Sequence, residues 1–119
     1  MDAAKGDAMW RQVMNSEPSG RSDDGGFLDL TKAHVFGEVW SRPELSVRDR
    51  RLVLIGMAAA SGLEDVAGLQ LDAALKLGEL DADDLRTLVV FLAHYAGWPR
   101  AARLNTEVEQ IISRHEKNQ

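Results

Sequence analysis

Apolar side chains recur at intervals of three and four residues along most of this chain of 119 residues. That spacing places them on one face of an α-helix. No stretch alternates between apolar and polar residues for long enough to indicate a β-strand. The pattern therefore predicts an all-α fold with about five core helices, plus an N-terminal arm. We expect the core helices near residues 27–40, 47–61, 63–77, 82–96 and 99–112.

Capping residues mark several of the expected helix ends. Ser46 is a favoured N-cap, and Asp49 follows it at the position where a capping box has an acid. Asp81 is the expected N-cap of a later helix, with further acids in its first turn. The expected C-terminal stops are Gly62, Gly78 and Gly97.

The N-terminal segment is separated from these helices by a polar stretch. Residues 2–14 are predicted to form a helix capped by Asp2. Residues 15–26 contain serine, glycine, proline and aspartate but almost nothing apolar, which is typical of a flexible linker. We therefore expect residues 1–26 to be an arm and linker, and residues 27–119 to be the compact helical domain.

The helix expected at 47–61 is apolar on every side after Arg51. Such a helix is central, and it is covered by other helices or by other subunits. Arg48 and Arg51, in its first turns, are interpreted as solvated or paired with Asp49 and Glu44.

A second pair of arginines has two interpretations. Arg42 and Arg50 flank the turn that leads into this helix. They are either solvated surface residues or a bidentate site for a carboxylate, in which each charge-assisted bond contributes about 1.5–3 kcal/mol.

One polar residue interrupts the apolar stripe of the helix expected at 63–77. The stripe residues fall at helical spacing and are Val66, Leu69, Ala73 and Leu77. Gln70 lies among them. A buried amide without hydrogen-bond partners costs about 1–3 kcal/mol. Leucine would fill the same space at less cost, so Gln70 requires an explanation.

Composition excludes several classes of function. The net charge is −5 and the pI is near 5.1, so no diffuse basic field attracts nucleic acid or anionic lipid. The chain has no cysteine, which excludes disulfides, thiolate metal sites and cysteine nucleophiles. It shows neither a signal peptide nor a run of about 18 apolar residues. We expect a cytoplasmic protein that binds neither nucleic acid nor membranes.

The common catalytic and binding motifs are also missing. His34, His94 and His115 are far apart and do not have metal-ligand spacing, so no metal site is predicted. The glycines match neither phosphate-binding pattern. There is no nucleophile elbow of the hydrolase type.

Two long stretches carry a family resemblance. "FGEVWSRPELSVRDRRLVLIGMAAASG" and "LQLDAALKLGELDADDLRTLVVFLAHYAGWPRAARLN" resemble the carboxymuconolactone decarboxylase family. The motifs on which this resemblance rests are F-G-x-V-W-x-R-P-x-L, R-x-L-V and Y-A-G-x-P, in that order. The resemblance runs from about Phe27 to Ile112.

The resemblance implies an all-helical fold shared with alkyl-hydroperoxidase-D-like proteins, assembled as homo-oligomers, trimers or hexamers, with sites near subunit interfaces. One branch of the family uses a C-x-x-C pair as a peroxidase. The other removes CO2 from a lactone of aromatic catabolism without metal or organic cofactor. Because this chain has no cysteine, its chemistry cannot be that of the peroxidase branch.

The resemblance also gives Gln70 a context. Aligned on "LDAALKLG", Gln70 occupies the position of a family histidine, and Val66 that of a family glutamate. Glutamine hydrogen-bonds and orients but does not shuttle a proton at neutral pH. Other candidates for that proton transfer are His34, Glu38 and the pair His94 and Tyr95. The predicted catalytic residues are Gln70, His94 and Tyr95, and the predicted substrate-binding residues are Arg42, Arg50, Trp40, Trp98 and His34.

Three hypotheses remain open at this point. The chain is a cofactor-independent lyase acting on a small carboxylated or lactone-type molecule, with Arg42 and Arg50 holding the substrate carboxylate. Alternatively, it is a family member that has lost catalysis and works as a small-molecule-binding or assembly protein. In the third hypothesis Gln70 is a structural amide, hydrogen-bonded to the backbone of a neighbouring helix.

Overall fold

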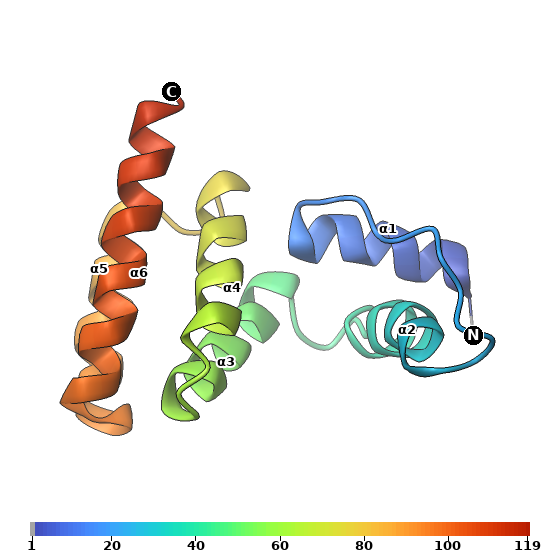
Figure 1. Ribbon diagram of the computed structural model, residues 1–119, viewed down its shortest axis with the longest axis horizontal. Helices are drawn as coiled ribbons and strands as arrows, with labels where there is room; N and C mark the ends of the chain where they lie inside the picture. The colour runs from blue at the N-terminus through green and yellow to red at the C-terminus, as the bar shows by residue number, and fades with distance from the viewer. Residues whose placement is uncertain (1) are drawn as a thin grey trace. The chain divides into compact units, whose positions relative to one another are not determined.

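The computed structural model describes residues 2–119, and all regular structure in that range is helical (Figure 1). The predicted all-α fold is confirmed. The chain divides into two compact units, the first ending at Arg50 and the second comprising Arg51–Gln119. The elements are α1 (Ala3–Met14), α2 (Phe27–Leu30), η1 (Thr31–Val39), α3 (Val47–Ala60), α4 (Glu64–Lys76), α5 (Ala82–Ala96) and α6 (Trp98–Lys117).

In the first unit, α1 packs closely on η1. A Cβ added to Gly6 would lie 1.9 Å from the Lys32 carbonyl oxygen, and one added to Gly37 would lie 3.1 Å from the Asp2 carbonyl oxygen. The two backbones approach this closely because neither glycine has a side chain. The helix expected at 2–14 is present, and within its unit it lies against η1.

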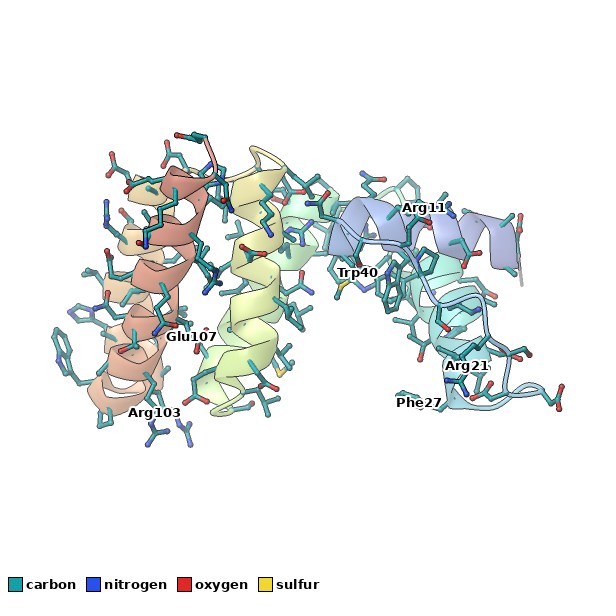
Figure 2. All side chains as sticks on the ribbon, turned by 45° about the horizontal axis from the view of Figure 1, so that its top comes forward. Arg11, Arg21, Phe27, Trp40, Arg103 and Glu107 are labelled. Atoms are coloured by element: carbon teal, nitrogen blue, oxygen red, sulfur yellow. The ribbon has the colours of Figure 1, made fainter. Side chains whose placement is uncertain are left out.

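Aromatic rings extend the contact between these two helices. The rings of Trp10 and Phe36 are 4.9 Å apart, and Phe36 stacks on Trp40 with centroids 6.1 Å apart. Figure 2 shows Trp40 beside α1. The division of the chain at residue 26 stays a prediction, although α1 and η1 share one compact unit.

The helix expected at 27–40 is present, but most of it is a π-helix rather than an α-helix. The Trp40 N–H donates to the carbonyl of Val35, five residues earlier. This wider winding buries Phe36 and Gly37 and leaves Val35 and Val39 exposed. Apolar spacing alone did not predict this, because π-helices are rare and usually limited to single turns.

The second unit is built around α4, α5 and α6, with α6 packed against both of the others (Figure 1). Its core also takes residues from α3. The buried apolar residues are Ile55, Ala58, Ala59, Ala67, Leu71, Ala74, Leu75, Leu80, Leu85, Val89, Ala93, Ala101, Leu104, Val108, Ile111 and Ile112.

The predicted stripe on α4 is wrong in part. Leu69 is 61% exposed and Leu77 is 41% exposed. The helix instead buries Ala67, Leu71 and Ala74, because small residues on that side let α4 pack closely against its neighbours. On α5, Tyr95 falls at the helical spacing of the apolar residues Leu88 and Leu92 but is also exposed.

The expected helix caps are largely confirmed. The Asp2 carboxylate accepts from the Lys5 N–H, and the Ser46 hydroxyl accepts from the Asp49 N–H. Asp81 and Asp84 form a reciprocal capping box at the start of α5. None of the helices in residues 2–119 has the length and apolarity needed to cross a membrane.

Candidate functional site

Gln70 is one of two buried polar residues described in this chain, and the other is Arg51. Gln70 lies on α4 and is 5% exposed, while Arg51 lies on α3 and is fully buried. The Arg51 Nη1 donates a hydrogen bond of 2.8 Å to the Gln70 Oε1. The polar break in the α4 stripe is therefore explained by a guanidinium that needs an acceptor.

Glu79 completes this cluster. The Arg51 Nε donates to the Glu79 Oε1 at 2.6 Å, and the Arg51 Nη2 donates to the Glu79 Oε2 at 3.0 Å. This parallel, two-bond geometry is the strongest common form of an arginine–carboxylate pair. Removing one partner of such a buried pair costs about 3–5 kcal/mol, because the other charge stays buried and unpaired.

Three chain segments meet at these residues, all within the second unit. Arg51 comes from the start of α3, Gln70 from the middle of α4, and Glu79 from the loop between α4 and α5. Gly78 adopts a positive φ of 75°, and the Glu79 N–H then bonds the Ala74 carbonyl. This tight helix end fixes the backbone from which Glu79 reaches Arg51. We call Arg51, Gln70 and Glu79 the buried polar cluster.

The sequence interpretation of Arg51 is therefore corrected. It is not a solvated residue, and its ion-pair partner is Glu79 rather than Asp49 or Glu44. Neither Arg51 nor Glu79 was among the predicted site residues. One signal was available: Arg51 opens the most apolar stretch of the chain, where a charge needs a partner.

Glu64 lies close to the family's glutamate position, but its described hydrogen bond leads away from the buried polar cluster. Glu64 accepts from Arg103 at 3.2 Å, and Figure 2 shows Arg103 on α6. The Glu64 backbone N–H and the Arg103 guanidinium hold the pKa of the Glu64 carboxyl below its ordinary value. Val66, which occupies the glutamate position itself, packs against the hydrophobic core.

The predicted catalytic residues His94 and Tyr95 lie on the exposed part of α5. The His94 Nδ1 is 2.8 Å from the Val90 carbonyl oxygen. Tyr95 is 79% exposed, and its ring lies 5.1 Å from that of Phe91. A shallow cavity of about 600 Å³ follows this helix face and includes His94.

Trp98, a predicted substrate-binding residue, lines a second cavity. This cavity is about 290 Å³ in volume, between α5 and the start of α6, and its polar lining residue is Asn105. Gln70 lines neither this cavity nor the one at His94.

The remaining predicted residues belong to the first unit, where Arg50 and Trp40 are brought together. The Arg50 Nη1 donates to the Trp40 carbonyl at 3.1 Å and to the Leu45 carbonyl at 2.6 Å. Its Nη2 donates to the Arg42 carbonyl. The terminal nitrogens of Arg50 thus hold the loop before α3, while the Arg42 side chain is exposed. His34, also exposed, is 3.4 Å from Glu38.

In residues 2–119 no group of three or more histidine, aspartate or glutamate side chains is arranged to hold a metal ion. In the buried polar cluster, the Glu79 carboxylate and the Gln70 amide oxygen accept hydrogen bonds from the Arg51 guanidinium, which itself has no acceptor or metal-binding atom. The guanidinium thus stabilises the negative charge of Glu79 and orients the Gln70 amide.

Comparison with known proteins gives a consistent assignment. The model of the carboxymuconolactone decarboxylase family matches residues 25–110. The 4-carboxymuconolactone decarboxylase of Acinetobacter baylyi is 37% identical over 86 residues, which cover 72% of this chain and 63% of that relative. The chain therefore spans less than two thirds of that relative's length. No solved structure matches the chain.

Proposed function

The chain belongs to the carboxymuconolactone decarboxylase family, and from this premise we propose that it is a cofactor-independent lyase. Its substrate would be a small carboxylated or lactone-type organic acid, from which it releases CO2. The observation that carries the proposal is the buried amide of Gln70, held 2.8 Å from the Arg51 guanidinium at the position of the family histidine.

The reaction makes a defined demand on the site. The bond between the carboxyl carbon and its neighbouring carbon breaks, CO2 leaves, and the electron pair stays behind as a carbanion delocalised into a dienolate. A proton must then be added to carbon. Preorganised donors that meet developing negative charge usually contribute the largest share of such catalysis. We propose that Gln70 orients the reacting group in this step.

Gln70 does not supply the proton, because an amide does not titrate near neutral pH. Loss of one general acid–base group forfeits about 10²–10⁴-fold in rate. We therefore propose a slow enzyme in which His94, Tyr95 or solvent delivers the proton. Arg42, Arg50, Trp40, Trp98 and His34 remain proposed substrate-binding residues.

The assembly and location are part of the same proposal. We propose a homo-oligomer, trimer or hexamer, that acts in the cytoplasm in aromatic catabolism. Exposed apolar side chains support association, because patches of this kind on a protein surface mark interaction sites. On the second unit they include Val53, Val90, Phe91, Tyr95 and Trp98.

The test is CO2 release from 4-carboxymuconolactone by the natural protein and by Gln70→His. We expect slow turnover by the natural protein and an altered or higher rate in the variant, because histidine titrates near pH 6.5 and restores a proton donor. Gln110→His is the matched control, since Gln110 is an exposed glutamine on α6. Folding is checked by circular dichroism. Absence of turnover in both the natural protein and Gln70→His would exclude this substrate.

The alternative function is a small-molecule-binding or assembly protein that has lost catalysis. It is favoured by one observation: Gln70 and Val66 replace both residues of the family's proton relay. Tryptophan fluorescence discriminates the two functions. Saturable binding of the lactone without CO2 release supports the alternative.

A further inference from the structure

We propose that one face of α5 is a two-fold interface, at which the α5 helix of a second copy of this chain packs antiparallel to the first. The inference deepens the homo-oligomer of the proposed function, because it names a contact surface and requires an even number of chains. It rests on that proposal only for self-association, and no step of catalysis enters it.

This face of α5 is a stripe of residues turned away from the protein core. The buried residues Leu85 and Val89 project from the other side of the helix. The stripe residues recur at helical spacing and line the shallow cavity of about 600 Å³ on this helix, and we call them the α5 stripe. They are Asp83, Arg86, Thr87, Val90, Phe91 and His94.

The α5 stripe has an apolar centre and a polar rim. Val90 is 60% exposed and Phe91 is 58% exposed, and both lie near the middle of the stripe. Asp83 and His94 lie at its two ends, and Arg86 lies along one edge. Apolar side chains that stand together on a surface and are surrounded by polar residues mark a protein–protein contact.

The order of residues along the stripe makes it complementary to its own reverse. Asp83 and His94 are equally far from the midpoint between positions 88 and 89, and so are Thr87 and Val90. A two-fold axis at that midpoint reverses the second α5 and sets each residue opposite its equidistant counterpart. Asp83 of one copy then faces His94 of the other at both ends of the contact, and Val90 packs on the methyl group of Thr87 between them.

This charge complementarity identifies a second copy as the occupant. The His94 Nδ1 is 2.8 Å from the Val90 carbonyl oxygen, which only accepts, so Nδ1 carries a proton. The Nε2 lies on the other side of the ring. A protonated imidazole therefore offers its Nε2–H to an acid from outside the chain, and Asp83 of the second copy supplies that acid.

The residues at the two edges of the stripe fit the same axis. Arg86 and Phe91 lie on opposite edges, so each comes near its own counterpart in the second copy. Two phenylalanine rings pack favourably. Two arginines alone would repel, but each Arg86 already holds Glu109 through bonds of 3.0 and 3.1 Å, which compensate its charge.

Analytical ultracentrifugation at pH 6, below the ordinary histidine pKa of about 6.5, tests the interface. We expect the natural protein to contain an even number of chains. In Asp83→Lys the new ammonium faces the imidazolium of His94, and the pair occurs twice, so we expect association to be about 10–100-fold weaker. The assembly should fall to half its mass, from dimer to monomer or from hexamer to trimer.

A charge exchange provides the most specific variant. Asp83→Lys combined with His94→Glu rebuilds the ion pair in the opposite sense, and we expect it to restore the assembly. Asp65→Lys is the matched control, because Asp65 is also an exposed acid in the first turn of its helix, α4, while Asp83 occupies that position on α5. Its assembly should stay intact.

The apolar centre has its own pair of variants. Phe91→Ala should weaken the same contact and halve the assembly, because the ring packs at the interface. Leu69→Ala removes an apolar side chain of similar exposure from α4 and should leave the assembly unchanged. Circular dichroism checks that each variant is folded.

Three results would each overturn the inference: a natural protein that is a monomer or a trimer, an assembly that survives Asp83→Lys intact, or an exchange variant that does not recover. Absence of CO2 release would overturn only the proposed function, because the mass of the assembly is measured without substrate.

Discussion

The close crossing of α1 and η1 makes Gly6→Ala a sensitive perturbation of the first unit. The new Cβ would lie 1.9 Å from the Lys32 carbonyl oxygen, and ordinary contact begins near 3.4 Å. The helices must therefore separate by about 1.5 Å at this point. The obstacle is a backbone atom, which cannot rotate away as a flexible side chain does.

The expected free-energy change is the balance of two terms. Overpacking of this kind costs about 1–3 kcal/mol, occasionally more, and the severity of the overlap places it at the upper end. Alanine in a helix interior gains up to about 1 kcal/mol over glycine. We expect Gly6→Ala to destabilise the first unit by about 2 kcal/mol.

Gly56→Ala is the matched control, with the opposite expected sign. It also lies inside a helix, but the nearest atom to its Cβ would be the Leu92 Cδ2 at 3.9 Å. Only the propensity term acts there, so we expect a gain of about 0.4–1 kcal/mol.

Urea unfolding followed by tryptophan fluorescence measures both changes. Trp10 and Trp40 report on the first unit and Trp98 on the second, so a Trp98→Phe background isolates the first. Circular dichroism follows all helices. A Gly6→Ala protein as stable as its parent in that background would show that the α1–η1 crossing is not close in solution.

Two further predictions concern charged and polar pairs. In Glu109→Gln we expect lower stability at pH 7, measured by thermal unfolding across pH. The Arg86 guanidinium lowers the pKa of the Glu109 carboxyl, so the difference from the natural protein should shrink as pH falls below the ordinary carboxyl pKa and vanish below the depressed one. Gln70→Leu should cost about 1.5–3 kcal/mol in urea unfolding, because it deprives the buried Arg51 of an acceptor. Combining it with Arg51→Met should cost less than the sum of the two single changes, whereas additive costs would contradict the hydrogen bond.

Local signals in the sequence predicted the helices well. Ser46 and Asp81 were identified as N-caps from residue type alone, because capping depends on atoms within three positions. The π-helical winding of η1 was not predictable in this way. Its residues satisfy a helical pattern that does not distinguish an α-helix from a π-helix, and its close contact with α1 at Gly6 and Gly37 involves residues distant in sequence.

The candidate site was predicted in part. Gln70 was identified because an amide among apolar residues contradicts the local pattern. Its hydrogen-bond partner was not, because Arg51 lies 19 positions earlier and Glu79 lies 28 positions after Arg51. Contacts at such separations depend on how the helices pack, which apolar spacing does not specify.

Helix geometry nevertheless excludes the neighbouring acid Asp49 as an ion-pair partner of Arg51. Asp49 lies two positions before it, and residues at that spacing do not face each other on a helix. The positions that do face Arg51, at three and four residues on either side, hold Val47, Arg48, Leu54 and Ile55. None of these is an acid. The carboxylate that pairs with Arg51 must therefore come from another segment of the chain, because a buried charge needs a partner. A polar residue among apolar ones in another helix, Gln70, indicates where Arg51 is buried.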